Sequence, residues 1–310
     1  MGLKTFTTAD GRVLRVVKGF RHRVLEYRPR VTPQPDWTEA DFIHGAEVKR
    51  RRCGRLIEKF SAFGGVLGDS AVLDVGCGDG SNCLVLARRG AKHVTGIDLH
   101  LPLFGDDEHA RLTRTLAHRI VDGVAASPDA APEAIGKLPV RFVHMDATRL
   151  EFLDASFDWL LSRSAMEHIR PIEPALREMA RVVRPGGIVY LSIDPFYWLR
   201  GCHKRGVVNI PFAHARLTLE DFCRFVTETK GEEMATLRHE RLATLNRFTV
   251  AQWRTLIEAM PCDLLGWDND HSELGETVLA EDSEIERTLL PGVTREDLLC
   301  ERIRVWLRRR

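Results

Sequence analysis

The 310-residue sequence predicts an α/β fold with a doubly wound, seven-stranded, mainly parallel sheet. From residue 70 onward, short runs of apolar and β-branched residues alternate with helical stretches, as in chains of parallel strands joined by crossover helices. The first run leads into three closely spaced glycines at residues 76–80. In such folds a glycine-rich turn at this position lies at the carboxyl ends of the strands, where ligands bind.

Composition and charge narrow the class of protein. Apolar residues make up 44% of the chain and charged residues 29%, which is typical of a folded globular protein. The net charge of +1 lacks the basic excess of a dedicated nucleic-acid-binding protein. Positive charge is concentrated in residues 1–60, with 14 Lys and Arg against 7 Asp and Glu. The chain has no apolar run of membrane-spanning length, no secretory signal and no regular cysteine spacing, so we expect a reduced, cytoplasmic protein.

Residues 1–69 are predicted to form a hairpin and a helical cover that precede the main domain at 70–310. The turn at residues 8–11 separates two short β-prone runs, which indicates a hairpin over 5–17. Thr38 with Asp41 three residues later matches a capping box, and the helix that follows should end near residue 60. The basic run 49–52 lies within this helix, as a solvated face or as a patch that contacts an anion.

The elements of the sheet domain follow in order. Strands are expected at 71–75, 93–98, 140–145, 157–161, 188–193, 263–267 and 301–307, and helices at 81–89, 107–126, 174–183 and 248–260. Two stretches interrupt the alternation. Residues 99–139 are longer than the layout needs and are predicted to add a helix and a surface loop, with a homodimer contact or a cofactor cover as their role. Residues 195–247 form an insert after the fifth strand.

The glycine turn indicates the kind of ligand. Asp74 lies two residues before Gly76, and Asp98 follows Gly78 by twenty residues, at the end of the second strand. An acidic side chain there can accept hydrogen bonds from both hydroxyls of a ribose. A dinucleotide fold has the spacing G-x-G-x-x-G, whereas this chain has G-x-G-x-G, and a buried carboxylate at Asp74 would repel a pyrophosphate. It would suit an ammonium or sulfonium group, and S-adenosylmethionine carries both as well as a ribose.

Further motifs accompany the turn in the order and spacing of one protein family. They are LDVGCGDG at 73–80, GIDL at 96–99, MDA at 145–147, FD at 157–158, MEHI at 166–169 and LREMARVVRPGG at 176–187. With these motifs the chain resembles the class I S-adenosylmethionine-dependent methyltransferases of the type-11-like group, which have a Rossmann-like sheet. The resemblance covers residues 70–195.

The resemblance implies roles for individual residues. The glycines would bend around the methionine part of the cofactor, near Asp74, and Asp98 would bind the ribose. Asp146 would contact the adenine amino group, or simply cap the turn that follows it. The implied cofactor-binding residues are Asp74, Gly76, Cys77, Gly78, Gly80, Asn82, Asp98, Leu99, Asp146, Ala147, Ser162 and Arg163.

The family normally places acceptor determinants in N-terminal helices and after strand five, so residues 195–247 are predicted to form an acceptor lid. The lid begins with three aromatic residues, Phe196 to Trp198, followed by His203. Each aromatic could instead be an apolar side chain that packs beneath the lid and does not contact the acceptor. The candidate acceptor-binding residues are Arg163, His168, Tyr197, Trp198 and His203, and the candidate catalytic residues are His203, His214 and Tyr197. No metal site is predicted, because Cys202, His203, His214 and Cys223 match no usual zinc spacing.

These features favour a methyltransferase that acts on an oxygen, nitrogen or sulfur atom of a small metabolite or natural product. S-methylation of a thioether amino acid such as methionine is the specific alternative. The chain carries Asp-Pro-Phe-Tyr after strand five rather than strand four, which argues against a planar amide or a nucleobase amine as acceptor. An RNA or protein methyltransferase that docks through the basic N-terminal region, and a binding protein without turnover, remain alternatives of another class.

Overall fold

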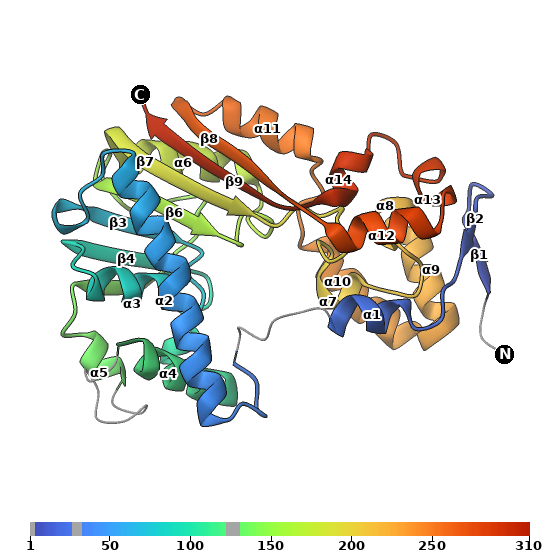
Figure 1. Cartoon of the computed structure of the whole chain (residues 1–310), viewed down its shortest axis with the longest axis horizontal. Coiled ribbons are helices and arrows are strands. Elements are labelled where there is room, and N and C mark those ends of the chain that lie inside the picture. Colours follow the sequence, from blue (N-terminus) through green and yellow to red (C-terminus); the bar gives the residue numbers. More distant parts are fainter. Residues whose placement is uncertain (1–3, 27–32, 122–130) are drawn as a thin grey trace.

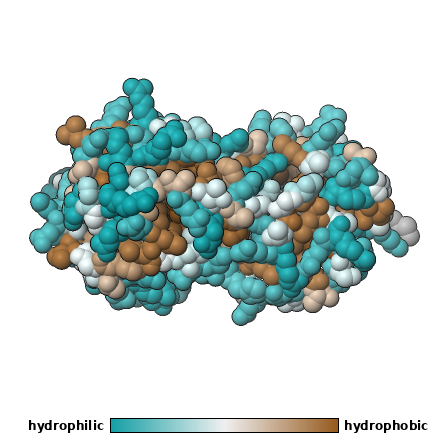
Figure 2. All heavy atoms as spheres, turned by 90° about the horizontal axis from the view of Figure 1, so that it is seen from above, coloured by the Kyte–Doolittle hydropathy of each residue, from teal (hydrophilic) through white to brown (hydrophobic). Residues whose placement is uncertain are grey.

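The computed structural model describes residues 4–26, 33–121 and 131–310. The chain forms two lobes that lie side by side (Figure 1). The sheet lobe comprises residues 33–121, 131–193, 248–271 and 300–310, and the helical lobe comprises residues 4–26, 195–247 and 273–299. Seen from above, the surface narrows between the lobes, and apolar side chains are visible on both (Figure 2). Within the described ranges, no helix combines the length and the apolar character needed to cross a membrane.

The seven-stranded sheet has the predicted mainly parallel topology, in the order β5-β4-β3-β6-β7-β9-β8. The strands are β3 (Ala71–Val75), β4 (His93–Asp98), β5 (Val140–His144), β6 (Phe157–Arg163), β7 (Val183–Ile193), β8 (Cys262–His271) and β9 (Cys300–Arg309). β3 to β7 pair in parallel, and β9 pairs antiparallel to β7 and β8. From β3 the chain builds one half of the sheet through β4 and β5 and then the other through β6 and β7. The switch point therefore lies between β3 and β6, where doubly wound folds bind ligands.

Alternating side chains place two hydrophobic cores on the two faces of the sheet. Val72, Trp159 and Tyr190 face a core shared with three helices on one side. Leu73, Leu160 and Val189 face a core on the other side. The helices of the first face are α2 (Glu39–Ala62), α3 (Ser81–Arg88) and α4 (Glu108–Val121), and those of the second are α6 (Ile172–Val182) and α11 (Val250–Glu258). The sheet is therefore covered on both faces, as predicted.

Helix α2 begins with the predicted capping box. The amide of Asp41 donates to the Thr38 hydroxyl, and the amide of Thr38 donates to the Asp41 carboxylate at 2.8 Å. Near the other end of the helix, the ring of Phe60 stacks on Trp159 of β6 with 4.2 Å between centroids. The capping box fixes where α2 begins, and the Phe60 contact packs its other end on the face of the sheet that carries α3. In Figure 1 the helix crosses in front of the strands.

The long segment between β4 and β5 holds a 3-10 turn at Pro102–Phe104, helix α4 and a short helix α5 (Ala131–Ile135). The extra helix predicted over 107–126 is thus confirmed up to residue 121, and its last residues, 122–126, lie outside the described residues. The surface loop was predicted over 127–139, and within it residues 131–135 are helical instead. A five-residue helix with a proline has too short a periodic pattern to be recognised from sequence.

The helical lobe is assembled from three separate parts of the chain. The N-terminal part holds the predicted hairpin, β1 (Thr5–Thr7) and β2 (Val13–Arg15), and α1 (Phe20–Glu26). The insert after β7 holds α7 (His203–Gly206), α8 (Ala213–Arg216), α9 (Leu219–Lys230) and α10 (Glu232–Ala243), and the chain between β8 and β9 adds α12 (Glu273–Glu281), α13 (Glu284–Arg287) and α14 (Arg295–Leu299). The N-terminal segment 1–69 is therefore shared between the lobes, with the hairpin in one and α2 in the other.

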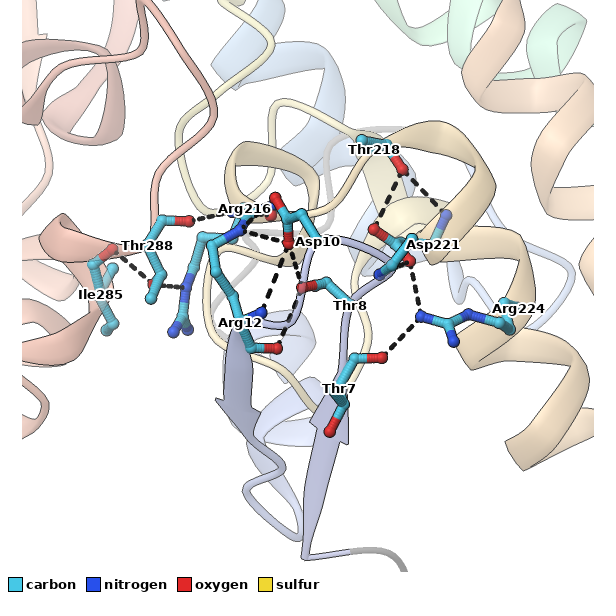
Figure 3. A network of polar contacts seen from close by, with 11 residues as sticks. Thr7, Thr8, Asp10, Arg12, Arg216, Thr218, Asp221, Arg224, Ile285 and Thr288 are labelled. Carbon is cyan, nitrogen blue, oxygen red and sulfur yellow. Dashed lines mark hydrogen bonds and ion pairs between the residues drawn. The ribbon is translucent and has the colours of Figure 1, made fainter.

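Polar contacts fasten the hairpin to the rest of the helical lobe (Figure 3). The amide of Ala9 donates to the carboxylate of Asp221 at 2.9 Å, and Arg12 donates to the carbonyls of Arg216 and Thr288 at 2.8 and 2.7 Å. Arg224 donates both to Asp221 and to the carbonyl of Thr7. Asp221 also lies in the first turn of α9, where its backbone amide donates to the hydroxyl of Thr218. It therefore joins two segments that are more than two hundred residues apart in sequence.

We expect Asp221→Ala to lower the free energy of unfolding by about 2–3 kcal/mol, because the amide of Ala9 and the Arg224 guanidinium both lose the buried carboxylate that accepts their hydrogen bonds. Urea unfolding followed by circular dichroism measures the change. Asp10→Ala is the matched control: its side chain is 59% exposed and pairs with Arg12, so its loss should lower the free energy of unfolding much less than Asp221→Ala does. Equal effects of the two substitutions would contradict the anchoring role of Asp221.

Candidate functional site

The glycine loop between β3 and α3 is bound to the end of β4. The amides of Gly76 and Cys77 both donate to the carbonyl of Ile97, at 2.9 and 3.0 Å. The amide of Gly78 donates to the carboxylate of Asp98 at 2.8 Å. The predicted glycine motif and the predicted acidic residue are therefore in direct contact, at the carboxyl edge of the sheet.

Each glycine of the motif has a positive φ, and the three differ in their surroundings. A Cβ at Gly76, with φ of +72°, would lie 2.3 Å from the Cβ of Ala165. A Cβ at Gly80 would lie 2.7 Å from Leu103. At Gly78, with φ of +53°, no atom lies within 4 Å of the Cβ position. Gly76 and Gly80 thus permit close packing of protein on protein, whereas Gly78 faces open space where a ligand can approach the backbone.

Asp98 is oriented by two backbone donors. One carboxylate oxygen accepts from Gly78 and the other from the amide of His100 at 3.0 Å. A carboxylate can accept about four hydrogen bonds, so Asp98 retains capacity for ligand hydroxyls. Next to it, the side chain of Leu99 is 63% exposed, and Phe104 in the following segment is 50% exposed. The edge therefore offers a charged acceptor beside apolar surface, which suits a ribose joined to a planar base.

Asp146 and Ala147 follow β5 at the same edge. The Asp146 carboxylate is exposed and accepts from the amide of Thr148 at 2.8 Å, while Ala147 is buried. The turn-capping role considered for Asp146 is thus present, and one of its oxygens remains for a ligand amino group.

Asp74 in β3 is a buried carboxylate with incomplete hydrogen bonding. Its side chain is 1% exposed, and one oxygen accepts from the thiol of Cys83 at 3.4 Å. Its other oxygen has no hydrogen-bond partner among the described residues. Burial raises the pKa of Asp74 to about 7, although the positive charge of Arg163 acts in the opposite direction. A cationic ligand nearby would favour the ionised form of this group.

The basic run of α2 meets the glycine loop. Lys49 pairs with Asp79 of the loop at 2.7 Å, and Arg50 donates to the carbonyl of Arg119 in α4 at 2.7 Å. Burial acts to raise the pKa of Asp79, but the Lys49 ammonium holds it below its ordinary value. These two members of the run thus position protein groups. The pairing of Lys49 with Asp79 could not be read from sequence, because nothing in the helix pattern indicates which loop it faces.

The ends of β6 and β7 carry the residues predicted to contact the methyl group and the acceptor. Ser162 is fully buried, and its hydroxyl has no partner within the described part of the chain. Arg163 is half-buried and lies opposite Ser192 of β7 in the sheet register. The turn after β6 then presents Glu167 and His168, and the buried side chain of Asn246 holds this turn by donating to the carbonyls of Met166 and Ile169 at 2.9 and 2.8 Å. Asn246 was not predicted from the sequence.

The predicted lid residues occupy two different environments. The rings of His168 and His203 stack with 5.0 Å between centroids. By contrast, Trp198 and His214 lie in the hydrophobic core of the helical lobe, and Tyr197 packs at its border, where its hydroxyl donates to the carbonyl of Arg247 at 3.2 Å. The Nε2–H of His214 donates to the carbonyl of Trp198 at 2.8 Å, and burial lowers the pKa of His214 to about 4.

Comparisons with known proteins identify the stretch that contains this site. A family model described as a methyltransferase domain matches residues 73–191. An uncharacterized methyltransferase of Mycobacterium tuberculosis is 33% identical over 121 residues, which cover 39% of this chain and 49% of that protein. A ubiquinone biosynthesis O-methyltransferase of Maricaulis maris is 32% identical over 119 residues, or 38% of each protein. The chain thus spans about half or less of the length of these curated relatives.

Solved structures of methyltransferases also align with this chain. A S-adenosylmethionine-dependent methyltransferase from Methanosarcina mazei aligns with 82% of this chain and 96% of that chain, with a TM-score of 0.47 and 19% sequence identity. The stretch matched by the family model begins in β3 and ends in β7. It includes the glycine loop, Asp98, Asp146, Arg163 and the turn at Glu167.

The buried carboxylate of Asp74 should make stability depend on pH. Its pKa is about 7 in the folded protein and 3.8 ordinarily, so between these values the folded state holds a proton that the unfolded chain has lost. The free energy of unfolding should therefore fall as the pH rises from about 4 to about 7, by up to about 1.4 kcal/mol per pH unit for this group.

Urea unfolding across this range, with wild type and Asp74→Asn compared at each pH, isolates the contribution of this group. The neutral amide in Asp74→Asn should remove the contribution of this group to the pH dependence of the free energy of unfolding. Asp106→Asn, a substitution at an exposed carboxylate, should leave the pH dependence as it is in the wild type. If the difference between wild type and Asp74→Asn is constant with pH, the raised pKa is wrong.

Proposed function

We propose that this chain, whose residues 73–191 form a class I methyltransferase domain, methylates a small molecule with S-adenosylmethionine as methyl donor. The observation that carries the proposal is the contact between the glycine loop and Asp98 at the switch point of the sheet, with the buried carboxylate of Asp74 beneath it. When bound, the cofactor supplies a methyl group activated by a sulfonium.

The residues at this edge fit the cofactor by charge and by shape. The open space at Gly78 permits close approach to the loop backbone, and Asp98 can accept from the ribose hydroxyls while it holds the loop. Asp74 has an unsatisfied carboxylate oxygen, which a nearby ammonium would compensate. Asp146 has an oxygen left for the adenine amino group. Orientation of the donor and exclusion of water are the main contributions that a protein makes to such a displacement.

An oxygen acceptor is favoured by the residues near the ends of β6 and β7. His168 is half-buried, and burial, together with the positive charge of Arg241, lowers its pKa, so the imidazole is neutral at neutral pH. A neutral imidazole can accept the proton or the hydrogen bond of an acceptor hydroxyl. The relative from Maricaulis maris is named for O-methylation. Burial of Trp198 in the core of the helical lobe leaves fewer aromatic faces for a sulfonium product, which disfavours a thioether acceptor.

RNA or protein as the acceptor finds less support. Lys49 and Arg50, half of the basic run in α2, are engaged with Asp79 and with a backbone carbonyl of α4. They do not form the free cationic surface that docking on a phosphate backbone needs. A small molecule needs no such surface.

The function is tested by mixing the protein with S-adenosylmethionine labelled in its methyl group and a cell extract divided into small molecules, RNA and protein. We expect label in the small-molecule fraction, on an oxygen atom. Label in RNA or protein would instead support the macromolecular alternatives, and no transfer with intact cofactor binding would support a binding protein.

Asp98→Ala should weaken the binding of S-adenosylmethionine by about 1.5–3 kcal/mol, or roughly ten- to hundredfold, because hydrogen bonds to a charged acceptor are lost. Isothermal titration calorimetry measures this change. Asp106→Asn removes an exposed carboxylate from the neighbouring segment and should bind the cofactor as the wild type does. Unchanged affinity in Asp98→Ala would overturn the ribose assignment.

A further inference from the structure

Three side chains with metal-binding atoms meet near the carboxyl ends of β6 and β7. Glu167 and His168 come from the turn after β6, and His203 comes from the start of α7. One ligand atom from each lies within 4.8 Å of the other two, and within the described residues no other group of three or more histidine, cysteine, aspartate or glutamate side chains is gathered in this way. The rings of the two histidines stack with an interplanar angle of 16°.

The backbone holds these side chains in place. Asn246 fixes the turn that carries Glu167 and His168. Its side chain donates to the carbonyl of Met166, and its backbone amide donates to the carbonyl of Glu167 at 2.8 Å. His203 has φ of +55°, a left-handed conformation that is unfavourable for a residue with a Cβ. Non-glycine residues keep such a conformation where the surroundings impose it, and these places are often functional.

Among the described residues Glu167 forms no ion pair, although the positive charge of Arg302 also acts on it. Its side chain is 2% exposed, and in the described part of the chain neither oxygen accepts a hydrogen bond of normal geometry. Asp194 lies near it, but that carboxylate pairs with Arg302 at 2.8 Å. Burial and the charge of Asp194 raise the pKa of Glu167 well above its ordinary value. A buried carboxylate of this kind is costly unless a cation or hydrogen bonds compensate it.

We propose that Glu167, His168 and His203 bind a divalent metal ion of the first transition row, such as Zn²⁺ or Fe²⁺. Two imidazole nitrogens and one carboxylate oxygen are a common ligand set for these ions. Ligands around a tetrahedral Zn²⁺ lie about 3.4 Å apart, so donor atoms already within 4.8 Å need only small side-chain rotations. Imidazole and carboxylate groups ligate metals in their deprotonated forms, so the ion competes with protons for all three side chains.

The role of the ion rests on the proposed function. With three protein ligands, the ion keeps an open coordination position. An acceptor hydroxyl bound there loses its proton to water more readily, because the ion stabilises the negative oxygen. That oxygen then forms a bond to the methyl carbon while the bond from carbon to sulfur breaks, and S-adenosylhomocysteine leaves. In the metal-bound protein His168 and His203 are ligands, and the ion takes over the activation of the hydroxyl that a neutral His168 could give in the metal-free protein.

Binding is tested independently of any acceptor. The full-length protein is stripped with a chelator and titrated with Zn²⁺ by calorimetry and with Co²⁺ by visible absorption spectroscopy. We expect one ion per chain, and we expect Glu167→Gln and His203→Ala to weaken binding roughly a hundredfold or more. His239→Ala, at an exposed histidine of α10, is the control and should bind as the wild type does. Thermal unfolding verifies that each variant is folded.

The outcomes separate this inference from the proposed function. The inference is overturned if the stripped protein binds neither ion, if Glu167→Gln and His203→Ala bind like the wild type, or if Co²⁺ shows the intense thiolate absorption of cysteine ligation. Methyl transfer that persists in the stripped protein would overturn the role of the ion alone. Stoichiometric binding without any methyl transfer would overturn the proposed function and leave the metal site standing.

Discussion

The site depends on one set of contacts, in which the end of β4 holds the glycine loop. The carbonyl of Ile97 accepts from two loop amides, and the carboxylate of Asp98 accepts from a third. These bonds give partners to three backbone amides of the loop and hold it at the end of β4. They also align Asp98 with the loop that a ligand must approach. One residue thus supports both the structure of the loop and the contact with a ligand.

The two lobes make different contributions to the site. The sheet lobe brings the ends of β3, β4, β5, β6 and β7 to one edge, because parallel strands all end on the same side. The helical lobe is built from the hairpin segment, the insert after β7 and the chain between β8 and β9. Its core buries the aromatic residues Phe196 and Trp198. The segment that directly follows β7 therefore contributes to the stability of this lobe, while His203, a few residues later, remains beside His168.

Local patterns made the sheet lobe predictable from sequence. The seven strands, the capping box at Thr38 and the motifs around Gly76 and Asp98 are all read from residues close together in the chain. The structure confirms the strands and the capping box, and it adds the contact of the loop with Asp98. The remaining features depend on distant residues. An aromatic run such as 196–198 has the same apolar character in a ligand lid and in a core, and its burial in the core of the helical lobe depends on residues from distant parts of the chain. Likewise, Asn246 and Glu167 are about eighty residues apart, so no pattern in the sequence connects them.

The distribution of charge along the edge explains why two different cations are expected there. Besides Asp98 and Asp146, four carboxylates lie in or near the site, and two of these four form an ion pair: Asp79 pairs with Lys49, and Asp194 pairs with Arg302. The other two, Asp74 and Glu167, are buried, and each retains oxygens without hydrogen bonds among the described residues. Burial raises the pKa of both, so each is most stable as an ion only when a positive charge arrives from outside. Asp74 lies beneath the glycine loop, and Glu167 lies beside two histidines. The first position therefore suits the ammonium or sulfonium of a cofactor, and the second suits a metal ion, because only there are imidazole ligands at hand.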